Sequence, residues 1–272
     1  MLLEEDRLKV EAAVEGKTLG AVLYLDELVD PKGQVPKEVH DKMGQVMQAL
    51  TRVALSTDRE LDFCVAVIRD AKQGNELIVT RSVDDTKRAN ADNIGIEESI
   101  NRTVFSQGQT QLSLPRLEFK LKEVLLENFL ADQIAQRIRF NLAKESREAA
   151  ENPLVLADGS YVVTPEGSKH FYFSMIGFKS KEPHANILGM FRIVNEVFSG
   201  YRFTQYDGVE LRDYLNRQKL VVDRSVFSDF QAKKINEEEI IRRYLVESQS
   251  VQEAFKLFGF NLPAGHEKDA VA

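Results

Sequence analysis

Apolar and polar residues alternate near the start of the chain, which is the pattern of half-buried β-strands. The alternation covers residues 8–14, and a second apolar run, residues 19–25, follows the turn-forming sequence Glu15-Gly16-Lys17. We therefore expect a β-hairpin here. The runs 61–69 and 76–81 predict a second hairpin, because the residues that join them are rich in turn formers.

Apolar residues at helical spacing predict two helices in the first half of the chain. The first begins at Pro36, and the second, which is long and amphipathic, covers residues 123–150. Asn152-Pro153 ends the second helix, since proline lacks an N–H group and disfavours helical geometry in the residue before it. The apolar stripe of the long helix consists of Leu126, Leu130, Ile134, Ile138 and Leu142.

The second half of the chain is expected to be mainly helical after one pair of strands. Residues 84–101, before this half, are polar and aperiodic and are interpreted as a long loop, in which one helical turn is a candidate near residues 96–100. We find no internal repeat. Strands are predicted at 161–164 and 170–178, and helices at 186–198, 207–217, 223–234, 236–246 and 250–258.

These elements predict an α+β fold with mainly antiparallel strands in the first half, a long central amphipathic helix and a helical C-terminal third. A length of 272 residues allows two domains. We expect an α+β domain of hairpins and the long helix over residues 1–152. A smaller domain, a β-hairpin followed by helices, is expected over residues 153–272.

The composition bears on membrane association, export and the cellular compartment of the protein. Charged residues interrupt every apolar run well before the ~20 residues that a membrane span needs, so no membrane association is expected. The acidic start of the chain, Glu4-Glu5-Asp6, lacks the basic residues of an export signal. The one cysteine, Cys64, lies in an apolar run and is expected to be a buried residue of a cytoplasmic protein, because a lone cysteine cannot form an internal disulfide.

The motifs in the sequence give no reason to expect a metal site or a cofactor. None of the four histidines has a second ligand at a recognised metal-binding spacing. Neither of the two common glycine-rich phosphate-binding motifs occurs, which excludes nucleotide hydrolysis by the commonest route. The histidines are His40, His170, His184 and His266.

One pattern has the spacing of a catalytic site. Glu118 and Lys120 are two residues apart in a strand predicted over residues 116–122, so they share one face. This arrangement resembles the metal-dependent nucleases of the PD-(D/E)xK type, in which an earlier acid completes a magnesium site. The resemblance implies that Asp85, or Asp84 beside it, supplies that acid and that Mg²⁺ is the cofactor. The same pattern is typical of any solvated strand face, so whether the chain is an enzyme stays open.

Aromatic and basic residues are interleaved between residues 169 and 206. A surface of this composition can stack nucleic-acid bases and hold phosphates. Because the net charge is −7, a nucleic acid would have to be held by a localised group of basic residues. The candidates are Lys169, Lys179, Lys181, Arg192, Tyr201, Arg202 and Tyr206.

Residues 238–259 resemble the first two helices of a helix-turn-helix. Pro263 and Gly265 fall where the recognition helix should run, and the remaining tail is not basic. A helical hairpin that packs on the core is the competing interpretation.

We interpret the chain as a non-enzymatic, cytoplasmic, macromolecule-binding protein that serves as a subunit of a larger assembly. A protein partner or a second copy of the chain is expected, and DNA or RNA is a further candidate partner. The alternative is the magnesium-dependent nuclease built on Asp85, Glu118 and Lys120.

Overall fold

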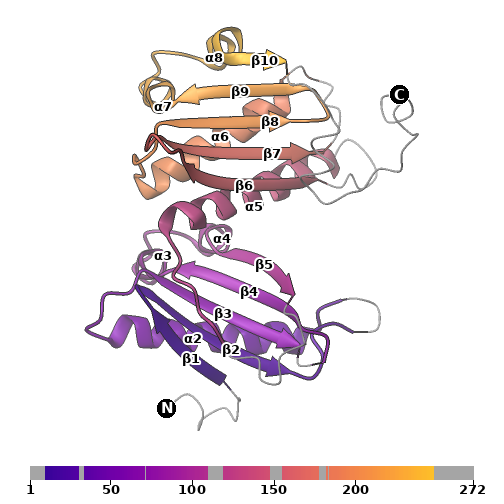
Figure 1. Cartoon of the computed structure of the whole chain (residues 1–272), viewed down its shortest axis with the longest axis vertical. Coiled ribbons are helices and arrows are strands. Elements are labelled where there is room, and N and C mark those ends of the chain that lie inside the picture. Colours follow the sequence, from indigo (N-terminus) through magenta and orange to yellow (C-terminus); the bar gives the residue numbers. More distant parts are fainter. Residues whose placement is uncertain are drawn as a thin grey trace. The chain divides into compact units, whose positions relative to one another are not determined.

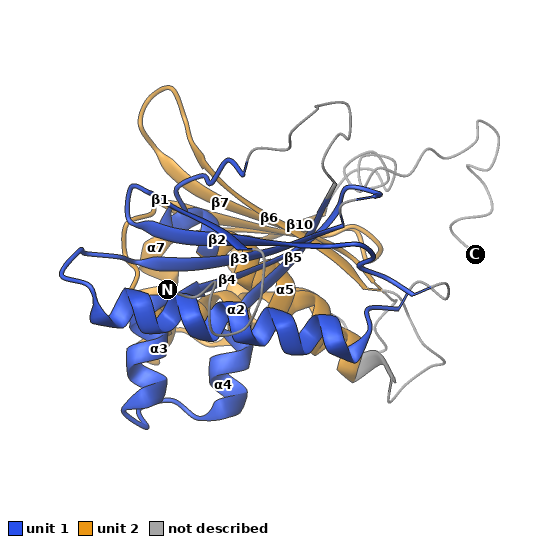
Figure 2. Ribbon diagram, turned by 90° about the horizontal axis from the view of Figure 1, so that it is seen from below, with its two compact units in different colours: residues 1–129 blue, residues 130–272 orange. Residues whose placement is uncertain are grey.

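The computed structural model describes residues 10–30, 34–70, 72–109, 119–147, 155–177, 182 and 184–247. The chain forms two compact units, residues 1–129 and 130–272 (Figure 2). The division falls between Phe129 and Leu130, inside the long helix, whereas the sequence suggested a boundary after that helix. The chain contains both helices and strands, in agreement with the predicted α+β class.

Unit 1 contains a five-stranded sheet with strand order β1-β2-β3-β4-β5 (Figure 1). Its strands are β1 (Val10–Glu15), β2 (Thr18–Leu25), β3 (Phe63–Asp70), β4 (Asn75–Ser82) and β5 (Val104–Gln109). Its helices are α2 (Lys37–Ser56), which joins β2 to β3, and α3 (Val83–Asn90) and α4 (Ile96–Asn101), which join β4 to β5. Both predicted hairpins are confirmed, β1 with β2 and β3 with β4.

Strands β2 and β3 are parallel, and every other pair in this sheet is antiparallel. Thr18 pairs with Phe63 at one end of the parallel pair and Leu25 pairs with Asp70 at the other. Parallel neighbours require a long crossover connection, which α2 provides.

Unit 2 contains a second five-stranded sheet with strand order β6-β7-β8-β9-β10. Strands β7 and β8 are the parallel pair. The strands are β6 (Leu156–Val163), β7 (Lys169–Ile176), β8 (Gly208–Asp213), β9 (Gln218–Asp223) and β10 (Leu245–Glu247). The helices are α5 (Leu126–Arg147), which enters from unit 1, α6 (Ala185–Tyr201), α7 (Arg224–Gln231) and α8 (Glu237–Tyr244).

The two units repeat one topology, so the expectation of no internal repeat is wrong. Each unit has a hairpin, a crossover helix, a second hairpin, two short helices and a last strand, in that order. The sequence supports the correspondence: Leu-Ile-Val-Thr-Arg-Ser-Val at 77–83 matches Leu-Val-Val-Asp-Arg-Ser-Val at 220–226. The short helices also correspond, since Arg102 pairs with Glu98 and Arg243 pairs with Glu239, each across one helical turn.

Both faces of the unit 1 sheet are covered. Helix α2 packs on the first face, where Leu50 and Ala54 belong to the same buried cluster as Ile68. Residues 119–124 pack on the second face, where Phe119 and Leu121 contact a group of buried valines. These residues form no strand, in contrast to the strand predicted over residues 116–122. The valines are Val22, Val65 and Val67.

Helices α5 and α6 pack against each other and against the unit 2 sheet. A Cβ atom added at Gly159 in β6 would lie 2.5 Å from the carbonyl oxygen of Ala131 in α5, so glycine permits this close approach. Leu142 of α5 lies beside Gly189 of α6. The predicted stripe of the long helix is buried at Leu130, Ile134, Ile138 and Leu142.

Two predicted elements differ in the structure. The helix predicted over residues 207–217 is wrong, because strand β8 and the turn into β9 occupy these residues. Val209 and Leu211 point into the core with the two-residue period of a strand. The long loop predicted over residues 84–101 contains α4 where one helical turn was a candidate, and it also contains α3, a short helix rich in charged residues that was not predicted.

A buried aspartate ends the first strand of the second hairpin in each unit. Asp70 accepts hydrogen bonds from the backbone N–H groups of Lys72 and Gln73, at 2.8 Å each, and of Leu28, at 3.3 Å. Asp213 accepts from the backbone N–H of Asn216 at 3.1 Å and from its side-chain amide at 2.6 Å. Each carboxylate therefore fixes the turn of its hairpin.

The pKa values of these two carboxyls move in opposite directions. Burial raises the pKa of Asp70, but the hydrogen bonds from Gln73, Lys72 and Leu28 outweigh burial and hold the pKa below 3.8. Burial dominates at Asp213 and raises its pKa above 3.8, despite the hydrogen bonds from Asn216. The charged carboxylate therefore stabilises unit 1, and charging its counterpart costs unit 2 free energy.

Asp70→Asn is expected to lower the free energy of unfolding at neutral pH by about 2–4 kcal/mol, because an amide cannot accept at both former carboxylate oxygens. Asp213→Asn should cost less. The stabilisation from Asp70 is complete above pH 3.8 and is lost as the pH falls, whereas Asp213 costs stability as the pH rises from 3.8 through its raised pKa. Urea denaturation of both variants between acidic and neutral pH measures this. Equal losses at neutral pH would contradict the assignment.

Leu130→Ala or Ile134→Ala should lower the free energy of unfolding by about 2–5 kcal/mol, because both side chains are fully buried. Phe140, on the same helix, is 59% exposed and supplies the control. Phe140→Ala should change stability by less than about 0.5 kcal/mol. Equilibrium denaturation of the three variants tests this, and a small effect at Ile134 would show that the stripe does not hold the fold.

Candidate functional site

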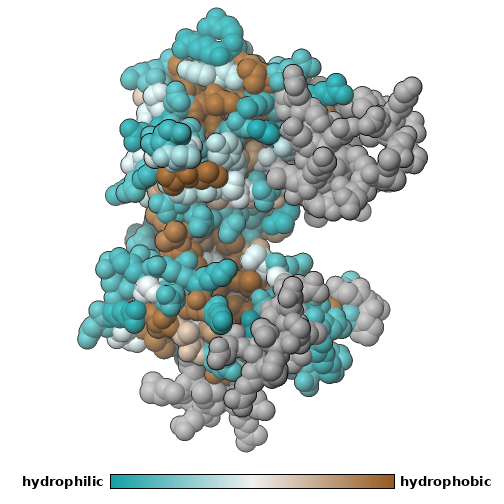
Figure 3. Space-filling model, in the orientation of Figure 1, coloured by the Kyte–Doolittle hydropathy of each residue, from teal (hydrophilic) through white to brown (hydrophobic). Residues whose placement is uncertain are grey.

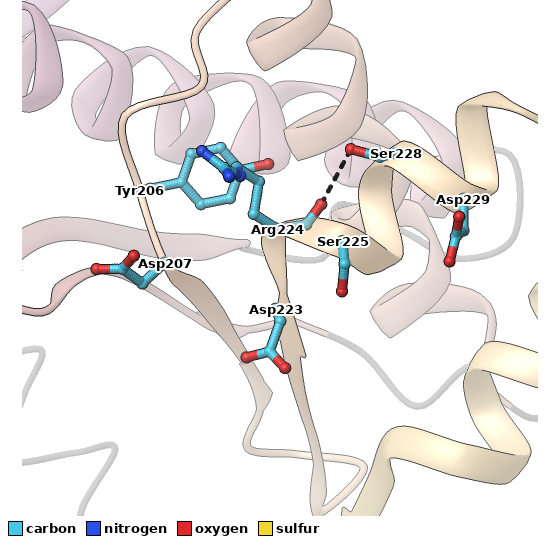
Figure 4. Close-up of a pocket in the computed structure, with 7 residues that line it drawn as sticks. All are labelled: Tyr206, Asp207, Asp223, Arg224, Ser225, Ser228 and Asp229. Carbon is cyan, nitrogen blue, oxygen red and sulfur yellow. Dashed lines mark hydrogen bonds between the residues drawn. The ribbon is translucent and has the colours of Figure 1, made fainter.

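A hollow of about 380 Å³ lies where strand β9 runs directly into helix α7 (Figure 4). Asp223 ends β9 and is the N-cap residue of α7, although its side chain makes no capping hydrogen bond. Arg224 follows at once and donates from Nη1 to the carbonyl oxygen of Thr204 at 2.8 Å. The lining residues are Tyr206, Asp207, Asp223, Arg224, Ser225, Ser228 and Asp229.

A second hollow, of about 540 Å³, shares Tyr206, Arg224 and Ser228 with the first. It extends along the ends of α6 and α7. We call the two hollows together the α6–α7 cavity. The second hollow is also lined by Phe198, Ser199, Arg202, Phe203, Thr204, Phe227 and Gln231.

One wall of the α6–α7 cavity is aromatic. The ring of Tyr206 lies 4.5 Å from the ring of Phe198, centroid to centroid, and is nearly parallel to the ring of Phe203 at 6.1 Å. Burial raises the pKa of the Tyr206 hydroxyl above its ordinary value. Tyr206 is only 4% exposed, so its ring belongs to the buried aromatic cluster beneath the cavity.

Charged groups of both signs surround this wall. Arg202 is exposed at the end of α6, where its backbone adopts the left-handed conformation. Asp207 accepts from the backbone N–H of Lys169 at 2.7 Å, and this hydrogen bond lowers the pKa of the carboxyl. At neutral pH the cavity therefore combines two guanidinium groups, from Arg202 and Arg224, with ionised carboxylate.

The structure brings together part of the predicted nucleic-acid surface. Arg202 and Tyr206 line the α6–α7 cavity, and Lys169 lies beside it through its bond to Asp207. Lys179 and Lys181 lie outside the described residues.

Two further candidates lie in other surroundings. Arg192 is exposed on α6 and pairs with Glu237 of α8 at 2.7 Å. The hydroxyl of Tyr201 accepts from the side-chain amide of Gln133 at 3.0 Å.

Sequence reasoning missed Arg224, which lines both hollows. The repeat offers the signal that would have found it, because Arg224 matches Arg81 in the repeated seven-residue sequence. In unit 1, Arg81 donates to the hydroxyl of Thr103 and is partly buried. In unit 2 the matching arginine, Arg224, is exposed and lines a cavity. The two units therefore differ in the surroundings of this arginine.

The structure places two of the nuclease candidates, Asp85 and Lys120, apart from each other. Asp85 lies on α3, is 1% exposed and forms an ion pair with Arg102 at 2.8 Å. Helix α3 lies on the α2 side of the sheet (Figure 2). Lys120 is exposed between Phe119 and Leu121, which pack on the opposite face of that sheet. Glu118 lies outside the described residues. Within the described part of the chain, no three His, Cys, Asp or Glu residues are grouped as a metal site.

Two other sequence-based predictions can be compared with the structure. Cys64 is buried, as predicted, and burial raises the pKa of its thiol to about 11. Strand β10 follows α8 where the helix-turn-helix resemblance needed its turn, and residues 248–259 lie outside the described residues.

No helix among the described residues is long and apolar enough to cross a membrane. Comparisons with family models, with curated proteins and with solved structures found no match to this chain.

Asp85→Asn separates a structural role from a catalytic one. Because the buried guanidinium of Arg102 would lose a charged partner, we expect the free energy of unfolding to fall by about 3 kcal/mol. Asp84 is exposed beside it, so Asp84→Asn should change stability by less than about 0.5 kcal/mol. Equilibrium denaturation measures both. An Asp85→Asn protein of unchanged stability that loses magnesium-dependent cleavage of nucleic acid would instead support the nuclease.

Proposed function

We propose that the chain is a non-enzymatic cytoplasmic protein that binds macromolecules as a subunit of a larger assembly, and that unit 2 binds single-stranded nucleic acid at the α6–α7 cavity. The observation that supports this proposal best is that Arg202 and Arg224 line one cavity, which also has an aromatic wall.

The charges of the cavity suit different parts of a nucleotide. Guanidinium groups bind phosphate through two parallel hydrogen bonds and can also stack on a base. Carboxylates accept hydrogen bonds from the amino groups of bases. Arg202 and Arg224 therefore serve the phosphate and the base plane, whereas Asp223 and Asp229 serve the base edge.

A single strand fits this cavity better than a duplex. The carboxylates would repel a continuous double row of phosphates, and their acceptor groups need base edges that are free of pairing. The volume of about 540 Å³ is within the range of ligand pockets and suits one nucleotide unit rather than a groove-wide contact.

Helix α4 supports the protein-binding part of the proposal. Ile96 is 83% exposed and Ile100 is 55% exposed, and their spacing places both on one side of the helix. In the matching helix of unit 2, α8, Ile100 corresponds to Ile241, which is partly buried. The exposed pair on α4 is therefore suited to contact with a protein partner or a second copy of the chain.

The double variant Arg202→Ala, Arg224→Ala tests the nucleic-acid proposal. Binding of a fluorescent single-stranded oligonucleotide, followed by anisotropy over a range of salt concentrations, should weaken by about tenfold or more at low salt. The slope of log affinity against log salt should flatten by about 1.4, because each lost phosphate contact accounts for about 0.7 on a single strand.

Arg192→Ala is the matched control, because Arg192 is an exposed arginine of the same unit that pairs with Glu237 and does not line the cavity. It should leave both the affinity and the slope unchanged. Absence of binding by the unmodified protein, or equal binding by the double variant, would overturn the proposal.

A further inference from the structure

The second face of the unit 1 sheet is closed by the chain segment that follows its last strand. Phe119 and Leu121 pack on Val22, Val65 and Val67, while Lys120 between them is exposed. The approach is close, because a Cβ atom added at Gly20 would lie 2.4 Å from Cδ1 of Leu121. The backbone N–H of Val124 donates to the hydroxyl of Thr18 at 2.9 Å and ties the segment to β2.

The equivalent face of the unit 2 sheet has three valines exposed. Tyr172, Glu210 and Val221 are cross-strand neighbours on this face, as Val22, Val67 and Ile78 are in unit 1. Apolar side chains lie among hydrophilic ones on this side of the unit, which faces the reader in Figure 3. The exposed valines are Val162, Val221 and Val246, at 41%, 45% and 51%.

The sequence after the last strand of unit 2 repeats the covering tripeptide. Phe119-Lys120-Leu121 follows β5, and Phe255-Lys256-Leu257 follows β10 after a similar length of chain. Residues 248–272 lie outside the described residues. The repeated topology places the end of β5 and the end of β10 at the same edge of their sheets.

We propose that the segment containing Phe255-Lys256-Leu257 docks on the second face of the unit 2 sheet, with Phe255 and Leu257 inward and Lys256 outward. The segment crosses Tyr172 and Val221, the counterparts of Val22 and Ile78. This intramolecular contact is independent of the nucleic-acid site, because the α6–α7 cavity does not include these residues.

The docked segment covers a small polar hollow of about 180 Å³. Glu210 is its central charge and pairs with both Arg212 and Lys219 on the same face. Since Glu210 stands where unit 1 has Val67, the segment buries less apolar surface here and is held less tightly than its counterpart. The hollow is lined by Asp158, Ser160, Tyr172, Phe173, Ser174, Glu210, Arg212 and Tyr214.

Cysteine cross-linking in the full-length chain tests the docking. In the variant Val221→Cys, Phe255→Cys, a short bismaleimide should join the two positions within one chain, detected by mass spectrometry of the digested protein. Cys64 contributes little background, because it is buried and its thiol pKa is raised to about 11. The control variant Arg192→Cys, Phe255→Cys has its first cysteine exposed on α6, which packs on the other face.

A yield several-fold above the control supports the proposal, and a yield equal to the control overturns it. A cross-link that joins two chains, seen as a covalent dimer, also overturns it in favour of a second copy as the occupant. Removing residues 251–272 from the Val221→Cys protein gives a second readout. Maleimide should then label the introduced thiol several-fold faster than in the full-length Val221→Cys chain, and an unchanged rate would contradict the docking.

Discussion

A buried, hydrogen-bonded aspartate at the end of the parallel strand pair is the interaction that fixes the same turn in both units. A parallel pair needs a crossover, and the backbone that enters the crossover has donors that the sheet cannot satisfy. Asp70 accepts from Leu28, in the connection to α2, as well as from its own turn. Asp213 does the same through the side chain of Asn186 in α6. In each unit, one side chain thus joins the crossover connection, the hairpin turn and the sheet.

Because the two units share one topology, the positions where their side chains differ indicate how the units differ chemically. Both units bury one sheet face under a crossover helix, and they differ mainly on the other face and at the start of the short helix after the second hairpin. Unit 1 has Val67 where unit 2 has Glu210, and Arg81 is partly buried where Arg224 is exposed. Unit 2 therefore has polar or exposed side chains at positions where unit 1 has apolar or partly buried ones.

Periodicity located the helices that have one buried and one exposed face, such as α2 and α5, because burial is what imposes the period. Strand β2, which is buried at six consecutive positions, was located as a continuous apolar run. Periodicity failed over residues 207–217, because the six residues of β8 give too few positions to separate a two-residue period from a helical one. The aromatic and basic composition pointed to Arg202 and Tyr206. Arg224 and the carboxylates beside it were missed, because only the tertiary fold brings the start of α7 to the end of α6.

In unit 1, the segment that covers the second sheet face follows the sheet in the chain, so the sheet is synthesised before the segment that covers it. Residues 119–124 leave the ribosome only after all five strands of that sheet, so Val22, Val65 and Val67 stay unprotected while the sheet assembles. An apolar sheet face exposed at this stage invites association between nascent chains or capture by a chaperone. The corresponding face of unit 2, with Glu210 at its centre, carries its own protection against such encounters.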